Sequence, residues 1–94
     1  MPPGPSSPAK LRQAPDALAL AALAWILEDA ERAQRLLALT GLEPATLRGA
    51  LGENSTLVAV LEFLANHEPD LLRAAEALAV TPEELIAAME VLRR

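Results

Sequence analysis

Two segments of the chain are almost continuously apolar. Residues 17–27 contain no charged or hydrogen-bonding side chain except the indole of Trp25, and Glu62 is the one charged residue within residues 57–65. A helix that is apolar all round is normally buried all round, so both segments predict central helices of a domain or part of a subunit interface. Asp16 precedes the first segment as a helix cap, and Asn54 or Ser55 precedes the second.

Caps and prolines divide the rest of the chain into four further short helices. Each predicted helix follows a polar cap or begins with a proline. The expected ranges, with their starting signals, are 30–39 (Asp29), 44–51 (Pro44), 69–79 (Pro69) and 82–92 (Thr81). Gly41 follows the predicted helix 30–39 and can adopt the left-handed backbone conformation that often ends a helix. Glu84 completes a capping box with Thr81.

The arrangement of these segments predicts the fold class. Short helices joined by turns of a few residues cannot form long parallel bundles, so residues 16–94 are expected to form one all-α domain, a compact orthogonal bundle of five to six short helices. Residues 1–15 hold five of the eight prolines, which predicts a disordered Pro-rich tail. That tail is either a flexible end or a proline-rich ligand.

Composition narrows the chemistry of the core. Hydrophobic residues make up 52% of the chain, but Trp25 and Phe63 are its only aromatic residues, so the core must consist mainly of Leu, Ala, Val and Ile. Leu and Ala favour helices. There is no cysteine, which excludes disulfides and thiolate metal ligands.

The charge distribution opposes two classes of partner. Residues 16–92 contain thirteen acidic residues and four arginines, a net charge of −9 for this part of a chain whose net charge is −5. An acidic body repels phosphate backbones and anionic lipids, so we expect neither nucleic acid nor membrane as a partner. No apolar run reaches the length of about 18 residues that a membrane span needs.

No set of residues predicts catalysis or metal binding. His67 is the only histidine and has no cysteine or second histidine beside it, so a surface or turn position is expected. Glu62 could be a buried acid or base, but an exposed position is favoured because Ser55, Ala59 and Asn66 share its side of the helix. We expect no enzyme, no cofactor and no small-molecule substrate.

Residues 71–92 have the outline of a helix-turn-helix. Ala74 and Ala75 stand in the first helix, and Thr81 caps the second. However, the second helix would present Glu83 and Glu84 to DNA, where carboxylates are repelled. Because of the helix-turn-helix outline, a DNA-binding or transcription-associated regulator that uses residues 71–92 remains the alternative function, although these charges oppose it.

Residues 14–92 resemble a family of small all-helical bacterial proteins catalogued as a domain of unknown function. The resemblance rests on four segments: Trp25-Ile26-Leu27-Glu28-Asp29, residues 36–44 followed by Leu47-Arg48, Leu61-Glu62-Phe63-Leu64, and Thr81-Pro82-Glu83. It implies a bacterial, cytoplasmic protein and carries no activity, cofactor or catalytic residue.

The sequence favours a non-enzymatic protein-protein interaction module or accessory subunit, with a protein partner or self-association. A chain of this length has too little protein to cover two helices that are apolar all round, and an uncovered apolar patch usually marks a partner surface. The residues expected to form that surface are Leu20, Trp25, Leu57, Leu61 and Leu64.

Overall fold

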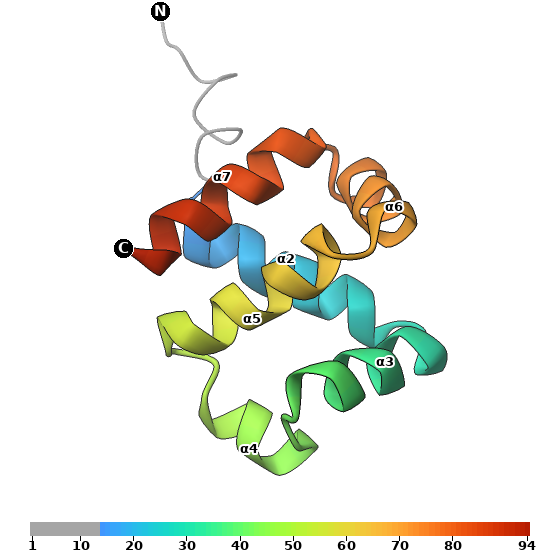
Figure 1. Ribbon diagram of the computed structural model, residues 1–94, viewed down its shortest axis with the longest axis vertical. Coiled ribbons are helices and arrows are strands. Elements are labelled where there is room, and N and C mark those ends of the chain that lie inside the picture. The colour runs from blue at the N-terminus through green and yellow to red at the C-terminus, as the bar shows by residue number, and fades with distance from the viewer. Residues whose placement is uncertain (1–13) are drawn as a thin grey trace, which may run out of the picture.

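A computed structural model describes residues 14–94, which form six α-helices and no strand (Figure 1). The helices are α2 (Pro15–Leu27), α3 (Ala30–Thr40), α4 (Pro44–Gly49), α5 (Asn54–Ala65), α6 (Glu68–Leu78) and α7 (Pro82–Arg93). The all-α class and the bundle of short helices are therefore confirmed. Residues 1–13 of the predicted tail lie outside the described residues, and Pro15 belongs to α2 rather than to the tail.

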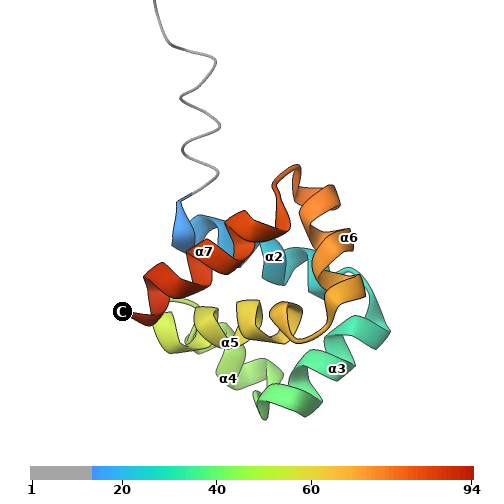
Figure 2. The same cartoon turned by 45° about the horizontal axis from the view of Figure 1, so that its top comes forward.

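The core lies between α2, α5 and α7, which pack against one another (Figure 2). Helices α3 and α6 lie against α2 and α5, and α4 lies at the end of the molecule away from α7 (Figure 1). The largest fully buried side chains are Ile26, Leu36, Leu57, Val60, Leu61, Leu64 and Leu85. The two apolar segments are central as expected, and the C-terminal helix shares that position with them.

Helix α2 is central as predicted, but it is not buried all round within the described residues 14–94. Leu23 and Ile26 face the core, whereas Leu20 is 40% exposed and Leu27 is 48% exposed. The reason is the small size of the domain: five other short helices cover a central helix on its inner side and leave its outer side in solvent.

Helix caps account for most of the observed boundaries. The Asp29 carboxylate accepts a hydrogen bond from the Arg32 amide at 2.9 Å, as a cap should. Thr81 and Glu84 form the predicted capping box, with both hydrogen bonds 3.1 Å long. The end of α3 is also as predicted, because Gly41 adopts a φ of 74° and its amide donates to the Leu37 carbonyl.

Two predicted caps are wrong. Helix α2 begins one residue earlier than Asp16, at Pro15, because proline is favoured in the first turn of a helix. Asp16 instead accepts a hydrogen bond from the adjacent amide of Ala17. Helix α5 begins at Asn54, so the capping position falls on Glu53, whose side chain makes no capping hydrogen bond.

We expect Leu61→Ala to lower the free energy of unfolding by about 2–5 kcal/mol, because the residue is 2% exposed and its truncation leaves a cavity. Leu20→Ala removes the same atoms from a residue 40% exposed and should cost less than about 1 kcal/mol. Urea unfolding followed by circular dichroism measures both values. Equal losses would contradict the assignment of Leu61 to the core and Leu20 to the surface.

Candidate functional site

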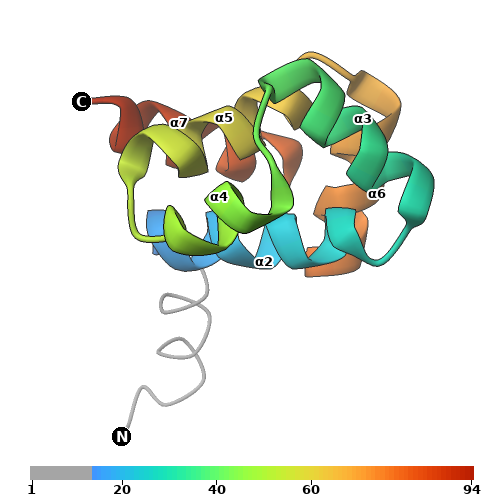
Figure 3. The ribbon, with the colours of Figure 1, turned by 90° about the horizontal axis from the view of Figure 1, so that it is seen from below.

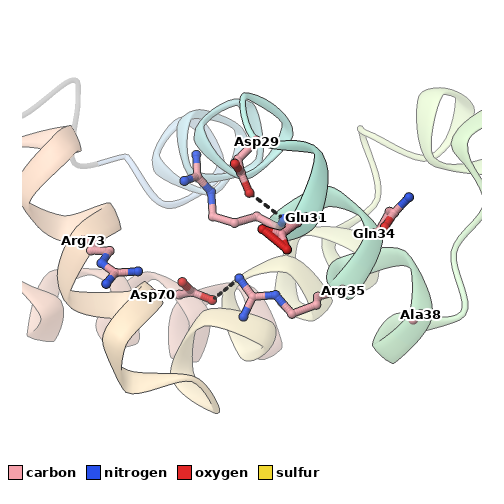
Figure 4. Close-up of a pocket in the computed structure, with 8 residues that line it drawn as sticks. Asp29, Glu31, Gln34, Arg35, Ala38, Asp70 and Arg73 are labelled. Carbon is pink, nitrogen blue, oxygen red and sulfur yellow. Dashed lines mark hydrogen bonds and ion pairs between the residues drawn. The ribbon is translucent and has the colours of Figure 1, made fainter.

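An open cleft of about 730 Å³, the α3–α6 cleft, is lined mainly by polar side chains (Figure 4). Its lining residues are Asp29, Glu31, Arg32, Gln34, Arg35, Ala38, Asp70 and Arg73. Three arginines face three carboxylates there, so the cleft carries no net charge and does not select an anion or a cation by charge alone.

Asp70 is the most deeply buried polar residue of this cleft. It is 3% exposed, and its Oδ2 atom lies 3.1 Å from Arg35 Nη2, at an angle too poor for a hydrogen bond. The carboxylate also lies in the first turn of α6, where the helix dipole stabilises negative charge. This ion pair joins α3 to α6, which otherwise share few contacts.

Arg32 is held by Trp25 across the turn between α2 and α3. Its guanidinium carbon lies 3.7 Å from the centre of the indole ring, and its Nη2 atom donates to the Trp25 carbonyl at 2.6 Å. Such a cation–π contact is favourable and leaves little of the indole face free. Trp25 is half-buried, and Arg32 lies over one face of its ring.

Arg32 and Arg35 do not pair with Glu28 and Glu31, the carboxylates four residues before them in the sequence. Arg32 lies over Trp25 instead of pairing with Glu28, and Arg35 reaches Asp70 instead of Glu31. The reason is solvation: pairs between exposed side chains on one helix gain little, whereas the buried Asp70 needs a cation. The cleft carboxylates and arginines thus mainly hold the fold together.

His67 and Glu62 occupy the positions expected for them. His67 stands at the start of α6, with its Nδ1 atom 3.3 Å from the Phe63 carbonyl and its ring 5.3 Å from the Phe63 ring. The side chain of Glu62 is 52% exposed and accepts a hydrogen bond from Arg93 at 2.7 Å. Within residues 14–94, no three His, Cys, Asp or Glu residues are grouped as a metal site.

An apolar groove of about 450 Å³, the α2–α4 groove, is lined by residues of α2, α3 and α4 and by Leu51. Figure 3 shows how α4 lies beside α2. Its lining residues are Leu23, Leu27, Ala33, Leu37, Pro44, Leu47, Arg48 and Leu51. Leu23 and Leu47 are buried in its floor, and Leu27 is 48% exposed at its edge. Arg48 is the one charged residue in the lining.

The structure separates the five residues expected to form a partner surface. Leu57 and Leu61 are 2% exposed and Leu64 is fully buried, so these three belong to the core and do not fit a partner surface. Only Leu20 is exposed. Sequence reasoning missed Leu27 and its neighbours in the groove, because the groove depends on how α4 lies beside α2 and α3.

We expect Arg35→Gln to lower the free energy of unfolding by about 1–3 kcal/mol, because Asp70 then remains buried without its cation. Arg73→Gln is the matched control: it removes the same charge from the same cleft, at an arginine that forms no ion pair with any described residue. Its effect should stay within about 0.5 kcal/mol. Similar losses in both variants, measured by urea unfolding, would show a general charge effect instead.

Comparison with known proteins places this chain in a family but assigns no activity. None of the helices within residues 14–94 is both long enough and apolar enough to cross a membrane. No curated protein and no solved structure matches the chain. A family model described as "Protein of unknown function (DUF3572)" matches residues 12–94. The chain belongs to this DUF3572 family.

Proposed function

We propose that this protein is a non-enzymatic protein-interaction module of the bacterial cytoplasm, and that its partner surface is the α2–α4 groove. The observation that carries the proposal is the apolar lining of that groove: seven of its eight lining residues are apolar. An open hollow of this kind is costly to leave in water and favours an apolar occupant.

The shape and size of the groove favour a helix as its occupant. Three helices border it, and Leu27 stands at its edge with about half of its surface exposed. Amphipathic helices bind such grooves through apolar side chains spaced three or four residues apart. The α3–α6 cleft offers a small molecule no comparable apolar surface, since Ala38 is the one apolar residue in its lining.

The charges favour a partner different from this chain. Two copies, each with a net charge of −5, repel one another at long range. Arg48 is exposed at the groove and has no acidic residue among the lining residues. The fitting partner is therefore a helix with an apolar stripe and an acidic residue placed against Arg48.

A DNA-binding function is the alternative, and one observation favours it. Helices α6 and α7 are joined by a short turn and the second begins with a capping box, as in a helix-turn-helix. Glu83 and Glu84 stand in the first turn of α7, where they repel phosphate. A gel shift with duplex DNA at about 50 mM salt tests it, and the absence of a complex there would remove this alternative.

The interaction proposal predicts position-specific crosslinking. A photoreactive benzophenone amino acid replaces Leu27 in the chain expressed in its own host, and irradiation should attach a second protein at that position. The reason is proximity, because a helix seated in the groove contacts the exposed face of Leu27. Mass spectrometry identifies the attached peptide.

The control places the same amino acid at Val91, which is 45% exposed on α7 and does not line the groove. It should give no adduct with that protein. An adduct only with a second copy of this chain would overturn the choice of a different partner. No adduct at position 27, in a variant whose circular dichroism is unchanged, would overturn the proposed surface.

A further inference from the structure

A second apolar groove is lined by residues of α6 and α7. These two helices lie on the side of the molecule away from α4 (Figure 1). This α6–α7 groove has a volume of about 440 Å³. Its lining residues are Glu68, Leu71, Leu72, Pro82, Glu83, Ile86 and Ala87. It shares no residue with the α2–α4 groove.

The groove presents apolar surface to solvent. Leu72 is 51% exposed, Ile86 is half-buried, and Ala87 is exposed beside it. Leu71 lies in the floor with 8% of its surface exposed and joins the groove to the core. Burying these side chains against a partner would remove apolar surface from water, which favours association.

Both charged residues of the lining are acidic. Glu68 stands in the first turn of α6 and Glu83 in the first turn of α7, and both are exposed. The arginines of these two helices lie elsewhere: Arg73 lines the α3–α6 cleft, and Arg93 pairs with Glu62 and Glu90. No basic residue of the lining neutralises the two carboxylates.

We propose that the α6–α7 groove binds a basic amphipathic helix of a partner protein, with apolar side chains against Leu72 and Ile86 and lysine or arginine side chains beside Glu68 and Glu83. Apolar contact supplies attraction, and the two carboxylates select a cationic helix and orient it. The same carboxylates reject DNA and acidic helices, so the charge at this groove is opposite to that at the α2–α4 groove, where Arg48 stands.

The test uses a synthetic amphipathic helix of about 18 leucine and lysine residues, about five helical turns, as the probe. Nuclear magnetic resonance of the labelled full chain should show shift changes at Leu72, Ile86 and Ala87 when the probe is added. A leucine and glutamate helix with the same apolar stripe should bind at least about tenfold more weakly, because its charges meet Glu68 and Glu83.

A matched pair of double variants separates local charge from overall charge. The combination of Glu68→Lys and Glu83→Lys should weaken probe binding about tenfold or more. The combination of Glu43→Lys and Glu53→Lys is the control, since both glutamates are exposed at helix starts outside this groove. Each combination changes the net charge from −5 to −1, because every Glu→Lys change adds two charges. Equal weakening by both combinations would overturn the proposal, since the attraction would then be general.

The apolar half of the proposal has its own control. Leu72→Ala should weaken probe binding by about threefold to tenfold, because a partly buried leucine loses contact area. Leu39→Ala, at a residue 62% exposed and outside this groove, should leave the affinity unchanged. Shift changes in the groove caused by duplex DNA and not by the basic helix would overturn the proposal in favour of nucleic acid.

Discussion

The burial of one face each of α2, α5 and α7 against one another is the interaction on which the rest of the structure depends. The chain has no disulfide and few aromatic residues, so the core consists mostly of leucine and alanine. Ala19 and Ala22 are fully buried, and their small side chains let neighbouring helices approach α2 closely. The flanking helices α3, α4 and α6 cover part of the remaining apolar surface of these three helices. Both apolar grooves lie between a flanking helix and a core helix.

The arrangement of a three-helix core covered by three flanking helices explains where polar groups are found. Most carboxylates lie at helix starts or in solvent, where they cost little. Asp70 is the exception, since the core reaches the start of α6 and takes the carboxylate out of water. Arg35 crosses from α3 to meet it, and so the position of α3 relative to α6 depends on one ion pair as well as on packing.

The sequence predicted the features that depend on neighbouring residues. The caps formed by Asp29 and Thr81 and the left-handed Gly41 are decided within one turn of helix, and they were predicted correctly. Ala79 shows the limit of local reasoning: it adopts a φ of 58° at the end of α6, although alanine is disfavoured there by about 1 kcal/mol, because the chain must turn toward α7.

Features that join distant residues could not be predicted in the same way. Arg35 and Asp70 are far apart in the sequence, whereas Glu31 lies only four residues before Arg35. The apolar segments gave no signal of which side faces the core, because nearly every position of residues 17–27 and 57–65 is equally suited to burial. Leu57, Leu61 and Leu64 were therefore expected at a partner surface and lie in the core, while Leu27 was not singled out and lies at the edge of a groove.

The two grooves differ in the one property that can distinguish their partners. Apolar contact is non-directional, so a groove of leucine and alanine side chains attracts any apolar stripe of suitable shape. Charged residues at the edge add repulsion against the wrong partner, which is how specificity usually arises. Arg48 at one groove and Glu68 and Glu83 at the other have opposite signs. Under the two proposed binding modes, a helix that one groove attracts by its charge therefore meets like charge at the other groove.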